Sequence, residues 1–519
     1  MADTPILIMK GIRKTFDKSV ALDDVNFELK TREIHGLLGG NGAGKTTLMN
    51  ILYGLYKMDF GEITLNNQKI SISSPHDAIN KHIGMVHQHF LQITSFTVLE
   101  NIVLGTNIQR KYTMDLTSEK KKIQDLQQRF TLDVDLDAMM DELPMGTRQK
   151  VEILKALYRG VEILILDEPT TNLTPQEVDD LFKSLRVMVN EGLSIVFITH
   201  KLREVLSVCD RISVLRNGRN VVTLNRDEAN EEAFVRGMVG DEMDIHNSII
   251  FSRGKSTTAG SEQIRKEVVL KLNQVGFSEK DSIPLLKNIS FELHQGEILG
   301  VAGVAGNGQK DLAEAIMGII PLTTGTMELN EKDINHYPTN KRLESGISYI
   351  PEDRLHDGFL PKASIAHNLI LGFHRKQPYS SNGFINWKKV NSTASELIET
   401  FNIKTSGPSD VGGNLSGGNI QRVMIARAFS KPSHLMVAHN PTRGLDIPSM
   451  NFVYTHLLDN KENGMATLLI SEDLDELLLL SDRIAVMYRG ELIGFLNRDK
   501  FEKYEIGRMM SGYKAEAQK

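Results

Sequence analysis

The sequence predicts an α/β fold that occurs twice along the chain, and three features predict it. Ala21–Gly36 aligns with Leu285–Gly300 at an offset of 264 residues. Later in each copy the offset is 272, as between His200 and Glu472, so the second copy has gained eight residues in its middle. Each copy also passes from alternating strand-like segments through a glycine-rich turn into a helix, and then alternates apolar runs with helices, as α/β domains do.

The chain is long enough for separate folded copies. It has 519 residues, of which 40% are hydrophobic and 24% charged, which is typical of a folded water-soluble protein. Between the copies, Phe251–Ser261 is small, polar and aperiodic and predicts a flexible connector. We therefore expect one domain over residues 1–240, a connector over 241–267, a second domain over 268–519, and a frayed tail over Lys514–Lys519.

Charge and composition exclude several classes of protein. The formal net charge is −6, so no overall basic field attracts nucleic acid, and we interpret Lys120–Lys122 as a solvated helical face. The only cysteine, Cys209, allows no internal disulfide, which favours a reducing compartment, the cytosol. Apolar runs such as Leu477–Leu480 are far shorter than the ~20 residues of a membrane-spanning helix, so we expect any membrane crossing to be made by a partner. The single tryptophan, Trp387, we expect to be a packing residue.

A glycine-rich turn in the first copy predicts a phosphate site. Gly39–Thr46 reads G-G-N-G-A-G-K-T, which matches G-x-x-x-x-G-K-[ST], and it lies between an apolar strand end and a helical run. Such a turn directs backbone N–H groups and a helix N-terminus at phosphate oxygens. Lys45 is then placed for the β- and γ-phosphates of a nucleotide, and the Thr46 hydroxyl for Mg²⁺.

Two acidic residues follow the apolar run Ile163–Leu166. Asp167 suits the outer shell of Mg²⁺, and Glu168 is placed to orient or deprotonate an attacking water. Two acids at a strand end can also face solvent or cap a helix, but here they would have to coexist by accident with the phosphate loop.

The second copy lacks these groups. Gln309 stands at the position of Lys45, and Lys310 at that of Thr46, from which its charge can reach a phosphate only by a shift. The acid pair is replaced by His439 and Asn440. We therefore expect little or no hydrolysis there, although nucleotide binding stays open.

A second motif shows the opposite asymmetry. In the second copy, Leu415–Gln421 reads L-S-G-G-N-I-Q, and Ser416 with the bare backbone that follows can bind an anion at a helix start. In the first copy the equivalent position is Pro144, which has neither a hydroxyl nor an N–H to offer. Asp446 is likewise replaced by Thr174.

Together these motifs resemble the ATP-binding cassette domain, the motor module of ABC transporters, over nearly the whole chain and twice. The resemblance implies two tandem P-loop nucleotide-binding domains, each with a RecA-like α/β core, an antiparallel β subdomain and a helical subdomain. It implies ATP and Mg²⁺ as cofactors, adenine stacking on Phe16, a Q-loop role for Gln88 and a switch role for His200. Considered alone, Phe16 is more typical of a core aromatic and His200 of a satisfied strand-end histidine. In the second copy Lys280 matches Phe16, with Phe277 as a possible substitute, and Glu352 and Glu472 match Gln88 and His200.

In that family two cassettes pack head to tail. Each ATP lies between the phosphate loop of one cassette and the signature motif of the other, the motif that Leu415–Gln421 resembles. For this chain the resemblance implies one complete composite site. Its catalytic residues are Gln88, Glu168 and His200; its ATP-binding residues are Phe16, Gly39, Asn41, Gly42, Gly44, Lys45, Thr46, Thr47, Ser416, Gly417, Gly418 and Asp446; its metal ligands are Thr46, Gln88 and Asp167.

The resemblance also implies the partners. A tandem chain with one degenerate half is similar to the ATPase subunit of bacterial importers for ribose, galactose and nucleosides. It implies two integral-membrane permease subunits, an extracytoplasmic substrate-binding protein or lipoprotein, and a peripheral location on the cytoplasmic face of the cell membrane. Ile83–Phe90, Leu143–Gly146 and Leu173–Glu177 favour the nucleoside branch, with a sugar importer as the alternative. A soluble translation-associated tandem cassette protein and a regulatory ATP sensor are further alternatives.

Overall fold

The computed structural model describes residues 4–16, 19–88, 90–105, 116–228, 231–239, 248–250, 267–278 and 284–513. The chain divides into two compact units, Met1–Ile245 and His246–Lys519. Most of the expected connector, the expected tail Lys514–Lys519, His89 and Lys280 lie outside the described residues. Among the described residues, no helix combines the length and the apolar character needed to span a bilayer.

The first unit contains two sheets. The antiparallel sheet has the order β2-β1-β4-β5, from Ser19–Lys30, Pro5–Phe16, Phe60–Leu65 and Gln68–Ile70. The larger sheet has the order β10-β9-β3-β8-β7-β6, from Arg219–Asn225, Arg211–Arg216, Ile34–Leu38, Ser194–Thr199, Ile163–Asp167 and Ile83–Val86. Five of these strands run parallel and β10 pairs antiparallel to β9. Every residue of β3, β7 and β8 is buried, as expected for interior parallel strands.

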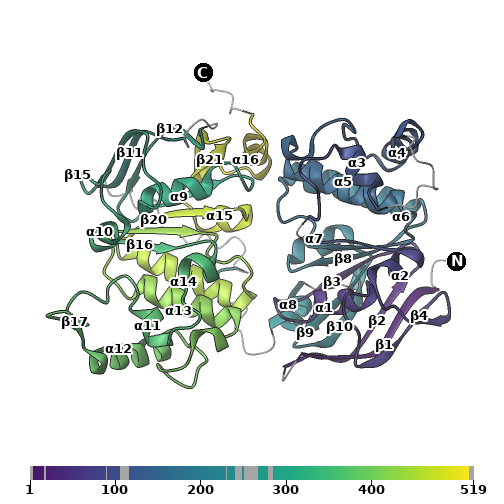
Figure 1. Cartoon of the computed structure of the whole chain (residues 1–519), viewed down its shortest axis with the longest axis horizontal. Helices are drawn as coiled ribbons and strands as arrows, with labels where there is room; N and C mark the ends of the chain where they lie inside the picture. Colours follow the sequence, from purple (N-terminus) through teal and green to yellow (C-terminus); the bar gives the residue numbers. More distant parts are fainter. Residues whose placement is uncertain are drawn as a thin grey trace. The chain divides into compact units, whose positions relative to one another are not determined.

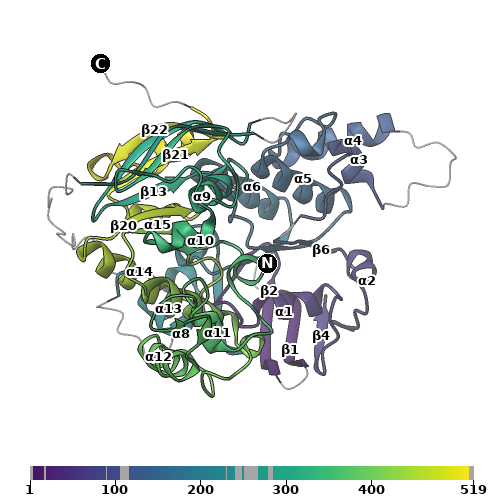
Figure 2. The same cartoon turned by 60° about the vertical axis from the view of Figure 1, so that its left-hand side comes forward.

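Three helices of the first unit form a group away from its antiparallel sheet. Helix α1 lies beside the antiparallel sheet, whereas α3, α4 and α5 lie together away from it (Figures 1 and 2). The helices are α1 (Lys45–Leu52), α2 (Pro75–Asn80), α3 (Val98–Val103), α4 (Leu116–Phe130), α5 (Met145–Tyr158), α6 (Pro175–Asn190), α7 (Leu202–Val208) and α8 (Glu231–Val239). The α/β plan predicted from the sequence, and the antiparallel sheet and helical group that the resemblance implies, are therefore confirmed in this unit.

The second unit repeats this plan. Its antiparallel sheet is β12-β11-β14-β15, from Leu286–His294, Val268–Phe277, Thr324–Leu329 and Lys332–Asp333. Its larger sheet is β16-β19-β20-β13-β21-β22, from Ile347–Ile350, Leu435–His439, Ala466–Ser471, Ile298–Ala302, Arg483–Tyr488 and Glu491–Asn497. Its helices are α9 (Gln309–Met317), α10 (Thr339–Glu344), α11 (Ile365–Leu369), α12 (Trp387–Thr400), α13 (Gly417–Phe429), α14 (Ile447–Glu462), α15 (Leu474–Leu480) and α16 (Lys503–Met510).

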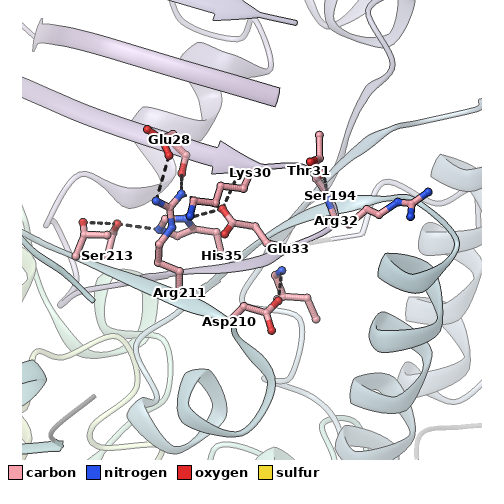
Figure 3. Close-up of polar contacts among 12 residues, drawn as sticks. Glu28, Lys30, Thr31, Arg32, Glu33, His35, Ser194, Asp210, Arg211 and Ser213 are labelled. Atoms are coloured by element: carbon pink, nitrogen blue, oxygen red, sulfur yellow. Dashed lines mark hydrogen bonds and ion pairs between the residues drawn. The ribbon is translucent and has the colours of Figure 1, made fainter. Parts of the chain in front are cut away.

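A polar cluster ties the two sheets of the first unit together (Figure 3). Arg211 on β9 donates to the Glu28 backbone oxygen on β2 at 2.8 Å and pairs with Glu33 at 3.0 Å. His35, fully buried on β3, lies 2.8 Å from the Ser213 hydroxyl, and burial lowers the pKa of this imidazole. The second unit repeats the tie with Arg483, which donates to Glu297 and to the Glu292 backbone oxygen. The cluster is therefore part of the duplicated framework.

Among the described residues, the second unit has a short hairpin before α12 for which the first unit shows no counterpart. Strands β17 (Ser380–Ser381) and β18 (Phe384–Ile385) form it directly before α12. It lies between Glu352 and Leu415, the interval in which the second copy gained eight residues. Trp387, at the first position of α12, packs its ring against His367, with centroids 4.7 Å apart, and is 42% exposed. The buried apolar residues of that helix are Val390, Ala394 and Leu397.

Candidate nucleotide-binding and catalytic site

The phosphate loop of the first unit runs from the end of β3 to the start of α1, where Lys45 is the first helical residue. Gly44 has a left-handed φ of 104°, and a Cβ there would lie 2.7 Å from Leu22 Cδ2, so only glycine fits. Gly42 is also left-handed, at 74°. No side chain caps the start of α1, which leaves its N–H groups available to an anion.

The Lys45 side chain folds back over this loop. Its Nζ donates to the Gly39 and Gly40 carbonyl oxygens at 2.8 and 3.0 Å, and only 6% of the residue is exposed. Burial lowers the pKa of the ammonium, while Glu168 and Asp167 oppose this effect. A cation held over a loop of inward-facing N–H groups suits the β- and γ-phosphates of a nucleotide.

Strand β7 delivers the two acids to the same region. Burial, followed by the neighbouring Glu168 charge, raises the pKa of Asp167 to about 6, and its carboxylate accepts a hydrogen bond from Thr46. A hydroxyl and a carboxylate in contact are hard oxygen donors of the kind Mg²⁺ prefers, so the residues fit this ion. Gln88 contributes an amide group nearby through its contact with Glu168.

Glu168 is held from two sides. Gln88 Nε2 donates to its Oε2 at 2.9 Å, and His200 Nδ1 lies 3.0 Å from its Oε1. Burial would raise the pKa of this carboxyl, but His200, Lys45 and Lys201 together outweigh burial and lower it. Glu168 is therefore an ionised, oriented carboxylate, the state that a general base requires. The structure brings Gln88, Glu168 and His200 together from three different strand ends, as the family resemblance implies.

The backbone at Glu168 is also unusual. Its φ is 48°, and its N–H donates to the Ile198 carbonyl at 2.9 Å. Asn440, at the corresponding position, has a φ of 45° and the equivalent bond to Ile470. A non-glycine residue in this region costs energy, and such strain clusters at functional sites. The second unit has kept this backbone conformation while losing the acid.

Phe16 lies at the end of β1 and is 39% exposed. It packs edge-to-face against Tyr56, with ring centroids 5.2 Å apart, and Lys14 Nζ lies 5.3 Å from its centroid. An exposed ring supported from one side can stack with a planar base. Phe277, the possible substitute in the second unit, is buried in the core under the antiparallel sheet, so it is not free to stack.

The corresponding loop of the second unit has the same backbone conformation before its helix, but the lysine ammonium is replaced by the amide of Gln309. Gln309 begins α9, is 6% exposed, and folds back like Lys45, with Nε2 donating to the Val304 oxygen at 3.0 Å. Lys310 lies 3.6 Å from Glu314 along its own helix, with 61% of its side chain exposed. Its charge is therefore partly neutralised by a neighbour one turn away.

A residue that the motifs missed, Arg443, dominates the rest of this degenerate site. It forms an ion pair with Glu352, which also accepts a hydrogen bond from Asn440 at 3.1 Å. Arg443 lies 3.9 Å from Glu472, and His439 Nε2 lies 3.6 Å from Glu352. Burial, the largest effect, lowers the pKa of His439. Glu352 and Glu472, which stand at the positions of Gln88 and His200, thus both face Arg443, and Asn440, at the position of Glu168, is hydrogen-bonded to Glu352. The available signal was Arg443 standing where the first copy has Thr171.

The buried carboxyl of Glu476, which contacts Thr442 next to Arg443, should make the free energy of unfolding depend on pH. It is buried, Thr442 donates to its Oε1 at 2.6 Å, and burial raises its pKa from 4.5 to about 7. Between those values the folded chain retains a proton that the unfolded chain releases, so stability falls as pH rises through this window and is constant above it. We expect a loss of about 3 kcal/mol between pH 4 and pH 8. Urea unfolding followed by Trp387 fluorescence measures it in the second unit, and Glu476→Gln should remove this pH dependence.

The two signature segments differ in what covers the helix start. In the second unit Ser416 precedes α13, and Asn419 donates to its hydroxyl at 2.9 Å. A Cβ on Gly417 would meet nothing within 4 Å, and one on Gly418 only Ser449 Oγ at 3.9 Å. This backbone is open to a ligand.

In the first unit the same place is covered by a carboxylate. Helix α5 begins at Met145 after Pro144, and a Cβ on Gly146 would collide with Glu177. Glu177 is held there by Thr174, whose N–H and hydroxyl both donate to its Oε2, at 2.8 and 2.9 Å. A negative charge at the helix start opposes a phosphate. Sequence inspection identified Pro144 but not Glu177.

Asp446 has a structural role as well as the implied one. It is the N-cap of α14, and its Oδ1 accepts from the Ser449 N–H at 2.9 Å. Thr174 caps α6 in the same way in the first unit. Capping alone therefore does not distinguish the two residues.

Comparison with known proteins agrees with these features. A family model described as ABC transporter matches residues 22–171 and 286–443. The chain is 40% identical over 512 residues to the nucleoside import ATP-binding protein NupA of Lactococcus lactis subsp. cremoris, covering 99% of both chains. It is 38% identical to the glucose import ATP-binding protein TsgD13 of Haloferax volcanii, covering 99% of this chain and 96% of the relative. It is also 38% identical to the guanosine import ATP-binding protein NupO of Bacillus subtilis, covering 98% and 97%.

Proposed function

Since the chain belongs to the ABC transporter family, as a tandem ATP-binding cassette ATPase, we propose that it powers the import of nucleosides. The observation that carries the proposal is the group of side chains gathered in the first unit, in which Glu168 is oriented by Gln88 and His200. Two of the relatives named above are nucleoside or guanosine import proteins. TsgD13, a glucose import protein, makes a sugar the alternative cargo.

In this proposal ATP lies on the Gly39–Thr46 loop, with Lys45 on its terminal phosphates and Phe16 against adenine. Thr46, Asp167 and Gln88 would hold Mg²⁺, which when bound neutralises charge on the phosphate oxygens. Glu168 accepts a proton from the attacking water, and Gln88 and His200 hold the carboxylate in place. The Nδ1 atom of His200 lies 3.0 Å from Glu168, which leaves the other ring nitrogen to contact the γ-phosphate.

We further propose that this loop is closed by the signature motif of the second half, through Ser416, Gly417, Gly418 and Asp446. The open backbone at Gly417 and Gly418 supports this pairing. The carboxylate of Glu177 against Gly146 argues against phosphate binding at the other signature segment. One composite site then hydrolyses ATP, and the site containing Gln309 and Arg443 serves as a scaffold for the closed state.

The printed names of the relatives describe ATP-binding proteins of importers. On that basis we propose two integral-membrane permease subunits and an extracytoplasmic substrate-binding protein or lipoprotein as partners. The location is then the cytoplasmic face of the cell membrane. Closure of the two cassettes on ATP and their release after hydrolysis would drive the permease between two states.

The cargo is tested by uptake in a strain lacking this chain. We expect the deletion to abolish uptake of labelled guanosine or uridine and to spare labelled ribose, galactose and glucose. The intact chain should restore uptake, whereas Lys45→Ala should not, because the phosphate cation is lost. Loss of sugar uptake alone would assign the chain to the sugar branch, and recovery of the chain with ribosomes rather than membranes would contradict an importer.

A further inference from the structure

One segment of the second unit has a charge opposite to that of the chain. Residues 358–395 contain no aspartate or glutamate, although the whole chain has a net charge of −6. The cations of the segment are Lys362, Arg375, Lys376, Lys388 and Lys389. Four of these lie within residues 374–389, the corner formed by the β17–β18 hairpin and the first turn of α12. We call this region the basic aromatic corner.

The corner also exposes apolar rings. Phe384 is 80% exposed and Trp387 is 42% exposed, with Ile385 at 37% between them in sequence. Every residue from Ser381 to Lys389 is exposed. Figure 1 shows the β17 hairpin projecting beside α12 at an edge of this unit. Phe384 buries little of its apolar surface on folding, so most of that surface is available to a partner.

Local structure holds these side chains outward. Asn382 and Gly383 have φ angles of 51° and 83°, which is the two-residue turn that an Asn-Gly pair favours in a hairpin. Asn386 caps α12 by accepting from the Lys389 N–H. The Trp387 ring packs on His367, with centroids 4.7 Å apart, which leaves 42% of the residue exposed. The corner therefore presents Phe384, the two lysines and the exposed part of the Trp387 ring to its surroundings.

We propose that the basic aromatic corner binds the anionic surface of the cytoplasmic membrane leaflet. This rests on the proposed function, which places the chain at that membrane. Basic side chains are attracted to anionic phospholipid headgroups, and tryptophan and phenylalanine partition into the interfacial layer beneath them. Cytoplasmic loops of membrane proteins are themselves rich in lysine and arginine, so charge disfavours the permease as the occupant. Headgroup phosphates have the complementary sign.

The test is flotation of the purified full-length chain with lipid vesicles, without permease, cargo or ATP. We expect binding to vesicles of phosphatidylglycerol and phosphatidylcholine and not to phosphatidylcholine alone. Lys388→Gln with Lys389→Gln should weaken binding on the order of tenfold. Phe384→Ser should weaken it by about as much, because the inserted ring is lost. Unchanged ATPase rates would show that both variants fold.

The matched control is Lys121→Gln with Lys122→Gln on α4. It removes the same charge from the corresponding helix of the first unit, where Glu119 pairs with Lys122. This variant should bind vesicles like the unmodified chain. Equal binding to both vesicle types, or an equal loss in the control, would overturn the proposal. So would binding of detergent-solubilised permease or single-stranded RNA that depends on the corner while vesicles stay unbound. Each of these results leaves the transport function standing, since uptake is measured separately.

Discussion

Replacing Glu168 by glutamine is expected to lower the ATPase turnover rate by about 10²-fold or more while ATP stays bound, because only the proton acceptor is lost. Glutamine keeps the length of the side chain and can still meet Gln88 and His200, which lie 2.9 and 3.0 Å from the carboxylate oxygens. Lys45 and the loop that holds the phosphates are unchanged. Steady-state phosphate release measures the first effect, and nucleotide retained through gel filtration measures the second.

The matched control is Glu472→Gln. It makes the same carboxylate-to-amide change at the position of His200 in the degenerate copy, where the side chain lies 3.9 Å from Arg443. Turnover should stay near the unmodified rate. Unchanged turnover in Glu168→Gln would show that Glu168 is not the proton acceptor. A comparable loss of turnover in Glu472→Gln would show that the second site also hydrolyses ATP.

Ser416→Ala, on the other half of the chain, is expected to depress turnover about tenfold or more, the value of a hydrogen bond to a charged phosphate. In the proposed composite site, the Ser416 hydroxyl and the backbone at Gly417 and Gly418, where an added Cβ would meet nothing closer than 3.9 Å, bind the phosphates held by Lys45. The Ser416 hydroxyl accepts a hydrogen bond from Asn419 and does not cap the backbone of its own helix. Its loss should therefore affect turnover more than folding. Measuring kcat and KM for ATP separates a loss of closure from a loss of binding.

Pro144→Ser provides the comparison in the first half. It restores a hydroxyl at the degenerate signature but leaves Glu177 against Gly146. Turnover should remain near that of the unmodified chain. If Pro144→Ser raised turnover and Ser416→Ala left it unchanged, the proposed pairing of half-sites would be wrong.

The phosphate loop was predictable because its geometry is local. Gly44 must be glycine for reasons of φ and of contact with Leu22, and the helix that follows starts at Lys45. The spacing of these residues along the chain is therefore enough to predict the shape of the loop. Asp167 and Glu168 were predictable for the same reason, since they stand at the end of the buried strand β7. The difference between Ser416 and Pro144 can likewise be read from residue order.

Other features were not predictable in the same way. Arg443 and Glu177 were missed because each acts on a group distant in sequence, Glu352 in one case and Gly146 in the other. Phe277, the possible substitute for Phe16, is buried in the core under the antiparallel sheet. Residue type predicts burial only on average, and the packing of the sheet decided this position.

The sequence by itself determined the duplicated α/β plan, the phosphate loop and the identity of the half that keeps its acids, because these depend on residue order and local backbone geometry. Only the tertiary structure decided the ionisation of those acids and the partners of the replaced positions. Asp167 is raised to a pKa of about 6 while its neighbour Glu168 is lowered, a difference that adjacent positions in a sequence cannot reveal. The physical reason is that burial and the charges of His200, Lys45 and Arg443 act through space, over distances that only the fold sets.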